Sequence, residues 1–372
     1  MGCVATRIVA DHDEKYRAGS MRAVDACNPQ EYRASRHNSR SARAHTKSTL
    51  ARMPGGNFGS FRPQKCDYHA RKNLNHVRES RLEIRGPSRV NQYRMVKRKP
   101  IGEGWQSKVY LVEDTNTQRQ YALKELKLKR MDKVIRRAKD SQLMADDDDD
   151  GDTSGSAWVE VSVGKILRHK NIVPLVEVIT DDDDSIFLAM ELQQGGELMR
   201  RKEAKRFSLP HARRAMRDVM RGLAHMHAQG VVHRDIKCDN CLVALDGTVK
   251  LCDFGMAHII EPGSDDSLSC AIGARKYRAP ELFDKGKRYS GFLADVWAAG
   301  CVFYALVAGN CPFESKSKRE LVHMILHRPV PITKRLGREP ALKDLLLKML
   351  AKKPRDRTSL QDALSHRWMM QG

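Results

Sequence analysis

The 372-residue chain lacks the features that mark secreted and membrane-spanning proteins. No hydrophobic run reaches the roughly 18 residues that a membrane-spanning helix needs, and no secretory signal core follows Met1. The nine cysteines include one C-x-x-C pair, Cys238 and Cys241, without the second pair that a zinc site requires. We therefore expect free thiols in a reducing compartment, which favours a cytoplasmic protein.

Aromatic and acidic residues are also few relative to the basic ones. Aromatic side chains make up 6% of the chain and are not interleaved with Lys and Arg, whereas RNA-binding arms need them to stack on bases. We therefore expect no nucleic-acid partner. The net charge of +21 suggests attraction to a membrane surface or an acidic substrate, or it serves only to keep the protein soluble. A hydrophobic fraction of 41% is enough for a folded core.

Residues 1–92 differ in composition from the rest of the chain. They hold 18 Lys and Arg against 8 Asp and Glu and show no sustained hydrophobic period, which predicts a disordered basic arm. The first six residues, M-G-C-V-A-T, fit the acceptor pattern for N-myristoylation of Gly2, and Cys3 beside it is a site for palmitoylation. Because one acyl chain anchors only weakly, Cys3 and nearby basic residues would supply the second signal. We expect a peripheral membrane tether.

The segment Val231–Asn240 concentrates groups that phosphoryl transfer requires. The carboxylate of Asp235 can accept the proton of an attacking hydroxyl, and Lys237 can neutralise charge on a transferred phosphoryl group. The amide oxygen of Asn240 can bind a hard divalent cation. These residues stand in the order H-R-D-x-K-x-x-N, the pattern of a protein-kinase catalytic loop. The pattern alone is weak evidence, so the other motifs of a kinase must also occur in the right order along the chain.

A glycine-rich turn and a strand lysine precede this segment. The range Ile101–Val112 reads as strand, turn and strand, in which Gly102 and Gly104 let backbone N–H groups approach a phosphate. Val109 would cover the nucleotide base. Lys124 follows on a short alternating strand, at the distance from the turn expected of a lysine that grips the α- and β-phosphates.

Two acidic residues complete the set. Glu160 borders the apolar face of a helix predicted over residues 159–169, where it can pair with Lys124. Further along, Asp246-Gly247 between two apolar segments predicts a β-hairpin. The hairpin would deliver Asp253 of a D-F-G motif, whose carboxylate would chelate magnesium.

In this order and spacing, the parts resemble the eukaryotic-type protein kinase domain over residues 93–369. The resemblance implies an α+β bilobal fold, with a small β-rich lobe over residues 93–192 and a larger, mostly helical lobe over residues 193–369. An acidic insert near residues 129–156 would form a solvated loop, because its aspartates lack the alternating spacing of calcium ligands. The disordered basic arm would precede this domain.

The resemblance also implies a reaction, the transfer of the γ-phosphate of ATP to a protein hydroxyl. Lys237 is the choice of Ser/Thr kinases, so we expect Ser/Thr acceptors. The catalytic residues would be Asp235, Lys237 and Lys124, and the Mg²⁺ ligands would be Asn240 and Asp253. The residues that would contact the nucleotide come from both lobes: Ile101, Gly102, Gly104, Val109, Ala122, Lys124, Glu160, Met190, Glu191, Gln193, Glu197, Asn240 and Asp253.

Further roles follow from the same resemblance. Asp295 would support the backbone of the catalytic loop, and Arg357 would pair with Glu281 of the A-P-E motif. Cys252, which precedes the D-F-G aspartate, would lie near the nucleotide and is a candidate for labelling by electrophiles. Within the family, residues 168–179 and Tyr289–Trp297 look most like the calcium/calmodulin-dependent kinase kinases and related upstream kinases.

Two positions depart from the family pattern in ways that affect activity. Gly164 stands where an apolar side chain usually packs on the phenylalanine of D-F-G, and a mid-helix glycine costs about 1 kcal/mol, which predicts a loosely held helix. Ala274 replaces the threonine that bridges the catalytic acid and lysine, which predicts weaker alignment of Asp235. These departures leave an alternative function, a pseudokinase scaffold that binds partners without phosphoryl transfer.

The expected activation loop has its own departure. Ala271 replaces the usual phosphorylated threonine. Ser264, Ser267 and Ser269 remain available, and Arg234 would receive such a phosphate.

Overall fold

The computed structural model describes residues 77–83, 88–104, 107–127, 157–180, 185–199, 206–284 and 286–371. The predicted lipidation sites Gly2 and Cys3 and the acidic insert near residues 129–156 lie outside the described residues, as does the short acidic run Asp181–Asp184.

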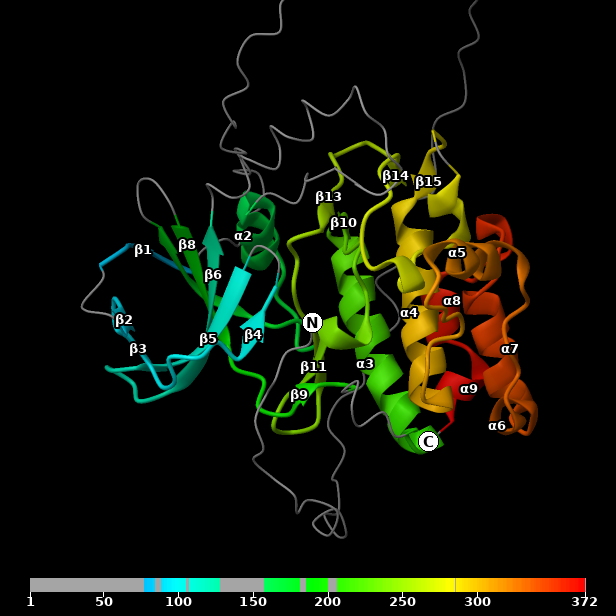
Figure 1. The fold of residues 1–372 in the computed structure, drawn as a ribbon, viewed down its shortest axis with the longest axis horizontal. Helices are drawn as coiled ribbons and strands as arrows, with labels where there is room; N and C mark the ends of the chain where they lie inside the picture. The colour runs from blue at the N-terminus through cyan, green and yellow to red at the C-terminus, as the bar shows by residue number, and fades with distance from the viewer. Residues whose placement is uncertain are drawn as a thin grey trace, which may run out of the picture. The chain divides into compact units, whose positions relative to one another are not determined.

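The first half of the described chain forms an eight-stranded sheet in the order β1-β7-β8-β6-β5-β3-β2, with β4 paired to β5 (Figure 1). The strands are β1 (Arg78–Arg81), β2 (Arg89–Val90), β3 (Tyr93–Met95), β4 (Gly102–Glu103), β5 (Ser107–Asp114), β6 (Gln120–Lys127), β7 (Leu175–Thr180) and β8 (Ser185–Glu191). Neighbours are antiparallel except β1 and β7. Helix α2 (Ala157–Ile166) packs on the sheet through the buried Ala157 and Val161. The predicted β-rich lobe with one helix is confirmed.

Strands β1 and β2 lie inside residues 1–92, the range predicted to be a disordered arm. The folded part of the chain therefore begins before residue 93. Composition could not show this, because β1 is almost wholly polar and is held by backbone pairing and by hydrogen bonds to Glu177 on β7.

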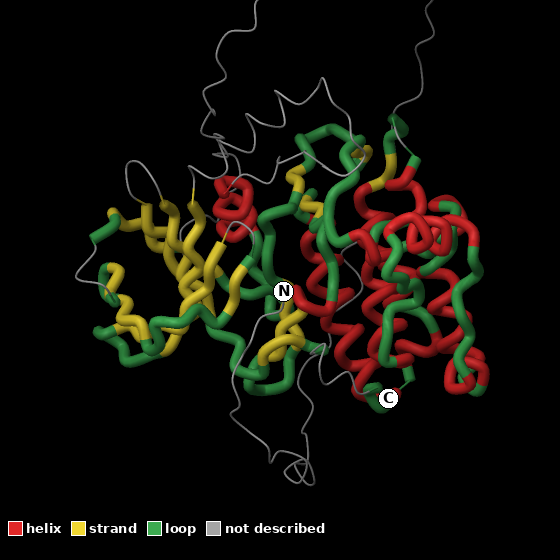
Figure 2. The backbone as a smooth tube through the Cα atoms, viewed as in Figure 1, coloured by secondary structure: helices red, strands yellow, loops and turns green. Residues whose placement is uncertain are grey.

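The second half of the described chain is mostly helical (Figure 2). Its helices are α3 (Leu209–Ala228), α4 (Gly291–Ala308), α5 (Lys318–His327), α6 (Lys334–Gly337), α7 (Pro340–Met349), α8 (Leu360–Leu364) and α9 (Arg367–Met370). Helix α3 begins where Ser208 accepts a hydrogen bond from the backbone N–H of His211, and it buries Met216, Val219 and Leu223 along one face. The predicted α+β bilobal fold is confirmed.

Helix α4 is the one described helix that is long and apolar enough, by length and composition, to cross a membrane. Asp295 interrupts it, so it does not form an unbroken apolar run of 18 residues. Most of it is buried inside the helical lobe, where Trp297 and Phe303 are fully covered. It therefore serves as the central helix of that lobe.

Short strand pairs shape the loops between the two halves. The predicted hairpin is confirmed as β11 (Cys241–Val243) paired with β12 (Val249–Leu251), and β9 (Gly196–Glu197) lies on its other side. Strand β10 (Val231–Val232) pairs with β13 (His258–Ile259), and β14 (Ser267–Leu268) pairs with β15 (Tyr289–Ser290). The segment between β10 and β11 is thereby held at both ends.

Candidate active site

The loop between β10 and β11 is fixed by a buried carboxylate on α4. The two oxygens of Asp295 accept hydrogen bonds from the backbone N–H groups of His233 and Arg234, at 2.8 and 2.9 Å. A third bond, 2.9 Å long, joins Asp295 to the Nε2 atom of His227 on α3. Arg234 adopts a left-handed backbone with φ 64°, which few side chains favour, so the Asp295 bonds stabilise this turn. The expected support of the catalytic loop is confirmed.

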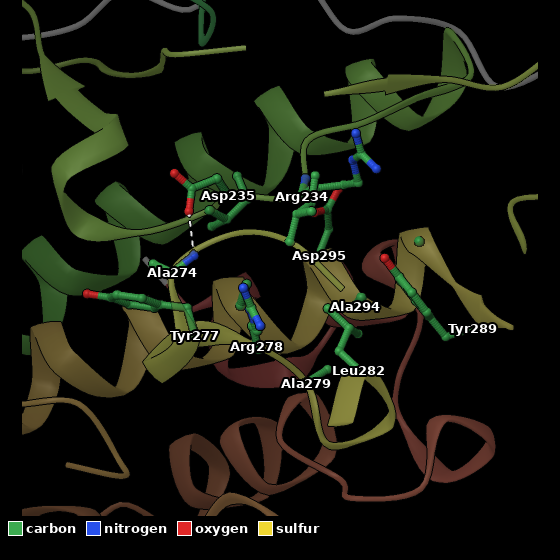
Figure 3. A pocket seen from close by; sticks show the side chains of 14 residues that line it. Arg234, Asp235, Ala274, Tyr277, Arg278, Ala279, Leu282, Tyr289, Ala294 and Asp295 are labelled. Carbon is green, nitrogen blue, oxygen red and sulfur yellow. Dashed lines mark hydrogen bonds between the residues drawn. The ribbon is translucent and has the colours of Figure 1, made fainter. Parts of the chain in front are cut away.

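Asp235 follows this turn and is held by three donors, one of which, the backbone N–H of Ala274, is drawn in Figure 3. Its Oδ1 accepts from the backbone N–H of Ala274 at 2.9 Å, and its Oδ2 accepts from Lys237 Nζ at 2.5 Å and from Asn240 Nδ2 at 3.2 Å. Burial alone would lower the pKa of Lys237, but the Asp235 carboxylate outweighs it and raises that pKa, so the ammonium stays charged. The sequence correctly grouped Asp235, Lys237 and Asn240 as one cluster.

Ala274 holds Asp235 through its backbone N–H. Alanine has no hydroxyl to bridge Asp235 and Lys237, so weaker alignment of Asp235 stays a prediction. Gly273 permits the N–H contact, because it adopts φ 91° and a Cβ there would lie 2.2 Å from the carbonyl oxygen of Arg234. Sequence reasoning missed the role of Gly273, for which the only indication was a glycine directly before Ala274.

A small cavity lies beside Ala274 and beneath the catalytic loop (Figure 3). Its volume is about 20 Å³, room for about one water molecule. The residues that line it include Asp235, Arg278, Leu282 and Ala298. The missing threonine side chain therefore leaves space without removing the bond to Asp235.

Lys124 joins the two lobes through three oxygens. Its Nζ on β6 lies 2.6 and 2.8 Å from the carboxylate oxygens of Glu160 on α2, and 2.8 Å from Asp253 Oδ1 after β12. Burial alone would lower the pKa of Lys124, yet the two carboxylates outweigh it and raise it. The Lys124 charge lowers the pKa of Asp253 to about 2, so that carboxylate stays ionised. The predicted pairing of Lys124 with Glu160 is confirmed.

Helix α2 packs closely at its glycine. A Cβ on Gly164 would lie 2.8 Å from Leu175 Cδ2, so the side chain of Leu175 on β7 fills the space beside this turn. Val161 and Val163 are buried, and Phe254 of D-F-G lies in the same apolar cluster as Val163. The space beside Gly164 is therefore filled by a side chain from a strand, which the helix sequence alone does not show. That the glycine loosens the helix stays a prediction.

The residues expected to contact the nucleotide fall on neighbouring strands. Gly102 on β4 pairs with Val109 on β5, and Val109 pairs with Lys124 on β6. Ala122 on β6 pairs with Met190 on β8. Two more backbone bonds close the turn, from Ile101 to Val109 and from Gly104 to Ser107, at 2.8 and 2.9 Å. The structure thus brings these positions together on one sheet.

The connector after β8 carries an ion pair that sequence reasoning missed. Lys250 on β12 bonds Glu191 Oε1 at 2.7 Å, and the side-chain amide of Gln193 donates to the same oxygen and to the Glu191 carbonyl. Glu197 lies on β9, where it pairs with Leu242 of the hairpin. The hairpin therefore fixes the segment that is expected to bond the nucleotide base. The Lys250–Glu191 pair could not be predicted from local sequence, because the two residues are 59 positions apart.

Cys252 is a poor candidate for electrophile labelling. Burial raises the pKa of its thiol far above the usual range, and its Sγ contacts the carbonyl oxygen of Asn240 at 3.5 Å. A thiol that stays protonated is a weak nucleophile. The sequence placed this residue correctly beside Asp253, but it could not show that the surroundings of this half-buried thiol raise its pKa.

The segment between D-F-G and A-P-E is fixed by hydrogen bonds, although position 271 is an alanine and cannot be phosphorylated. Asp266 accepts hydrogen bonds from the hydroxyl of Ser290 and the backbone of Phe292, at the start of α4. The hydroxyl of Tyr289 donates to the Cys270 carbonyl at 2.5 Å. Ser267 contacts Arg288 at 2.7 Å, and this arginine, not Arg234, is the cation beside its hydroxyl.

The A-P-E glutamate is paired as expected. Arg357 donates to both oxygens of Glu281 at 2.6 and 2.8 Å, and also to the carbonyl of Leu293. The guanidinium is fully buried, so this bidentate pair joins the end of the segment to the helical lobe.

Comparison with known proteins agrees with this geometry. Residues 95–369 match the protein kinase domain family. Serine/threonine-protein kinase GRIK1 of Arabidopsis thaliana is 33% identical over 292 residues, covering 76% of this chain and 68% of that protein. Serine/threonine-protein kinase GRIK2 of the same plant is 33% identical over 308 residues, covering 79% and 70%.

A third kinase gives a similar match. Serine/threonine-protein kinase ssp1 of Schizosaccharomyces pombe is 31% identical over 314 residues, which cover 81% of this chain but only 46% of that protein. The family model covers well over half of the chain and includes every residue that holds Asp235 and Lys124. The chain therefore belongs to the protein kinase family and is a serine/threonine protein kinase.

Proposed function

We propose that this kinase transfers the γ-phosphate of ATP to serine and threonine hydroxyls of other proteins, with Asp235 accepting the proton of the attacking hydroxyl. The observation that supports this most directly is the hold on both oxygens of Asp235, by the backbone of Ala274 and by Lys237. A carboxylate fixed in this way can orient a hydroxyl and take its proton as the new bond forms.

Lys237 would act on the phosphate side of the same reaction. Its pKa is raised, so it carries a positive charge at neutral pH, 2.5 Å from Asp235. A fixed positive charge placed where negative charge accumulates lowers the barrier, because it needs no reorganisation during transfer. The proton acceptor and the charge stabiliser thus stand side by side.

The nucleotide would lie between the sheet and the D-F-G segment. Lys124 would contact its phosphates, and Glu160 would hold Lys124 in place from α2. The backbone of the β4–β5 turn would approach the phosphates at Gly102 and Gly104.

Protein kinases generally use ATP with Mg²⁺, and the residues of this site fit that ion. The Asn240 amide nitrogen is engaged by Asp235, which leaves its oxygen for a cation, and Asp253 adds an ionised carboxylate. Within the described ranges, no cluster of three or more His, Cys, Asp or Glu residues could hold a metal alone. This agrees with Mg²⁺, which binds through one or two protein oxygens together with substrate phosphates. When bound, Mg²⁺ would neutralise charge on the phosphates.

The test is transfer from labelled ATP to peptide libraries that carry Ser, Thr or Tyr as acceptor. We expect label on Ser and Thr peptides. Label confined to Tyr peptides would contradict the acceptor class. If the protein binds nucleotide but labels no peptide, the pseudokinase alternative replaces this proposal.

We further propose that the kinase belongs to the calcium/calmodulin-dependent kinase kinase group, acts on other kinases, and is tethered at the cytoplasmic side of a membrane. Residues 168–179 and Tyr289–Trp297 support the group, and Gly2, Cys3 and the basic charge support the tether. Fractionation of cells that express the wild type or Gly2→Ala tests the tether. The wild type should enter the membrane fraction and Gly2→Ala the soluble one; equal distribution would refute it.

A further inference from the structure

The strand β1 lies outside the region that matches the kinase family, yet it is part of the same sheet. The family match begins at residue 95, whereas β1 covers Arg78–Arg81. It pairs in parallel with β7 along its whole length, from Arg78 opposite Glu177 to Arg81 opposite Thr180, and Leu82 adds a backbone bond to Thr180. The strand therefore covers the β7 edge of the sheet.

A buried carboxylate on β7 depends on this strand. Glu177 is 3% exposed, and burying a charge is costly unless polar groups compensate it. Ser80 donates to its Oε1 at 2.7 Å, and Arg78 lies 3.1 Å from its Oε2. The phenol of Tyr93 donates to Oε2 at 2.9 Å. The side-chain amide of Gln92 also donates to Oε2, at 2.7 Å. Two of the four partners, Arg78 and Ser80, come from β1, so the strand contributes to stabilising a charge inside the lobe.

The same segment reaches helix α2 at two points. Val77 packs against the apolar cluster that contains Ala157 and Val161 on the inner face of the helix. At the last turn of α2, Lys165 forms an ion pair with Glu79. The segment thus joins the apolar cluster into which the helix packs, and it contacts the last turn of the helix directly. Glu160, which holds Lys124, lies on the same helix.

We propose that residues 77–83 position α2 for catalysis, with Glu79 and Lys165 as positioning residues that keep Glu160 against Lys124. A shift of α2 away from the sheet would lengthen the contact between Glu160 and the Lys124 ammonium, and the lysine would then be misplaced for the nucleotide phosphates. The inference rests on the proposed function, because it assigns the segment a part in ATP use by the same site.

The test reverses the charges of the Glu79–Lys165 pair in the full-length protein. The variants are Glu79→Lys, Lys165→Glu and the two combined, with Arg94→Glu as a matched control. Arg94 forms an exposed ion pair with Glu113 in the same sheet, at 2.7 Å, on strands β3 and β5. The readouts are KM for ATP, KM for peptide, and hydrogen exchange of the backbone amides in residues 157–166.

Each single reversal should raise KM for ATP by about 1.5- to 5-fold, the range for an exposed ion pair, and should speed amide exchange in α2. KM for peptide should not change, the combined variant should return toward wild type, and Arg94→Glu should behave as wild type. If the Glu79–Lys165 pair only stabilised the fold, the reversals would lower the melting temperature without a selective rise in KM for ATP. Unchanged single variants, an equal effect of Arg94→Glu, or a combined variant that fails to recover would each overturn the inference.

The two proposals fail in different ways. A wild-type protein that labels no peptide would refute the proposed function, while the exchange of α2 amides would still report whether Glu79 and Lys165 hold the helix. A second variant, Arg78→Ala with Ser80→Ala, removes both β1 partners of Glu177 and should also speed exchange in α2. Exchange equal to that of the wild type would count against the segment.

Discussion

Replacing Gly273 by alanine should disturb the hold on the catalytic aspartate more than any neighbouring glycine replacement. An added Cβ would lie 2.2 Å from the Arg234 carbonyl oxygen, at least about 1 Å closer than carbon and oxygen normally approach. Arg234 is fixed by Asp295, so the segment carrying Gly273 must move away from the loop. That movement breaks the bond from the Ala274 N–H to Asp235.

The size of the effect follows from the bond that is lost. A hydrogen bond to a charged group contributes about 1.5–3 kcal/mol, which corresponds to a fall in kcat of about 10- to 100-fold if the loss falls on the transition state. The left-handed backbone adds about 1–2 kcal/mol of destabilisation to the folded state. KM for ATP should change little, because Gly273 does not contact the residues that hold Lys124.

The matched control is Gly263→Ala in the same segment. Gly263 has a similar backbone, φ 84°, but no atom lies within 4 Å of the position of a Cβ. Gly263→Ala should therefore lower the melting temperature slightly and leave kcat unchanged. The assay is steady-state transfer to a Ser peptide, with thermal unfolding of both variants. A kcat for Gly273→Ala within about twofold of the wild type would refute the reasoning.

Three further predictions follow from the site and its surroundings. Burial lowers the pKa of the stacked His169 and His225, so the unfolded chain binds more protons than the folded chain near their ordinary pKa. The free energy of unfolding should therefore fall as pH drops from about 7.5 to about 5.5. Over that range the melting temperature of His225→Gln should fall less than that of the wild type, and an equal fall would contradict this. Iodoacetamide at about pH 7.5 should modify Cys252 in denaturant but not in the folded protein, as measured by mass spectrometry. Rapid labelling of the folded protein would contradict this, because it would show that the thiol is accessible and ionised. Glu160→Gln should lower kcat/KM for ATP by about 10²-fold, since it breaks a buried ion pair with Lys124, and a loss of less than about twofold in steady-state kinetics would exclude that role.

Sequence patterns predicted the parts of the site whose residues lie in recognisable short motifs. The grouping of Asp235, Lys237 and Asn240 follows from their spacing in one loop, and the hairpin before Asp253 follows from a turn with Asp246-Gly247. The pair of Lys124 and Glu160 was predicted from the order of a strand and a helix. The loop and the hairpin depend on residues a few positions apart, whereas Lys124 and Glu160 are 36 positions apart and were paired from the order of the kinase motifs.

The parts that were missed depend on contacts between distant segments. Leu175 fills the space beside Gly164, and Lys250 pairs with Glu191, but neither partner carries a local mark of its role. The polar composition of β1 predicted an arm, although Glu177 gives that strand a place in the sheet. Such contacts are decided by tertiary packing, which composition and periodicity do not report.

The measurement that tests the central claim most directly compares phosphoryl transfer by the wild type and by Asp235→Asn at saturating ATP and Mg²⁺. The asparagine keeps the size of the side chain but cannot accept the proton of the attacking hydroxyl. Transfer to Ser and Thr peptides should fall by at least about 10²-fold, while nucleotide binding stays close to that of the wild type. Equal transfer by the two proteins would contradict the assignment of Asp235 as the residue that accepts the proton.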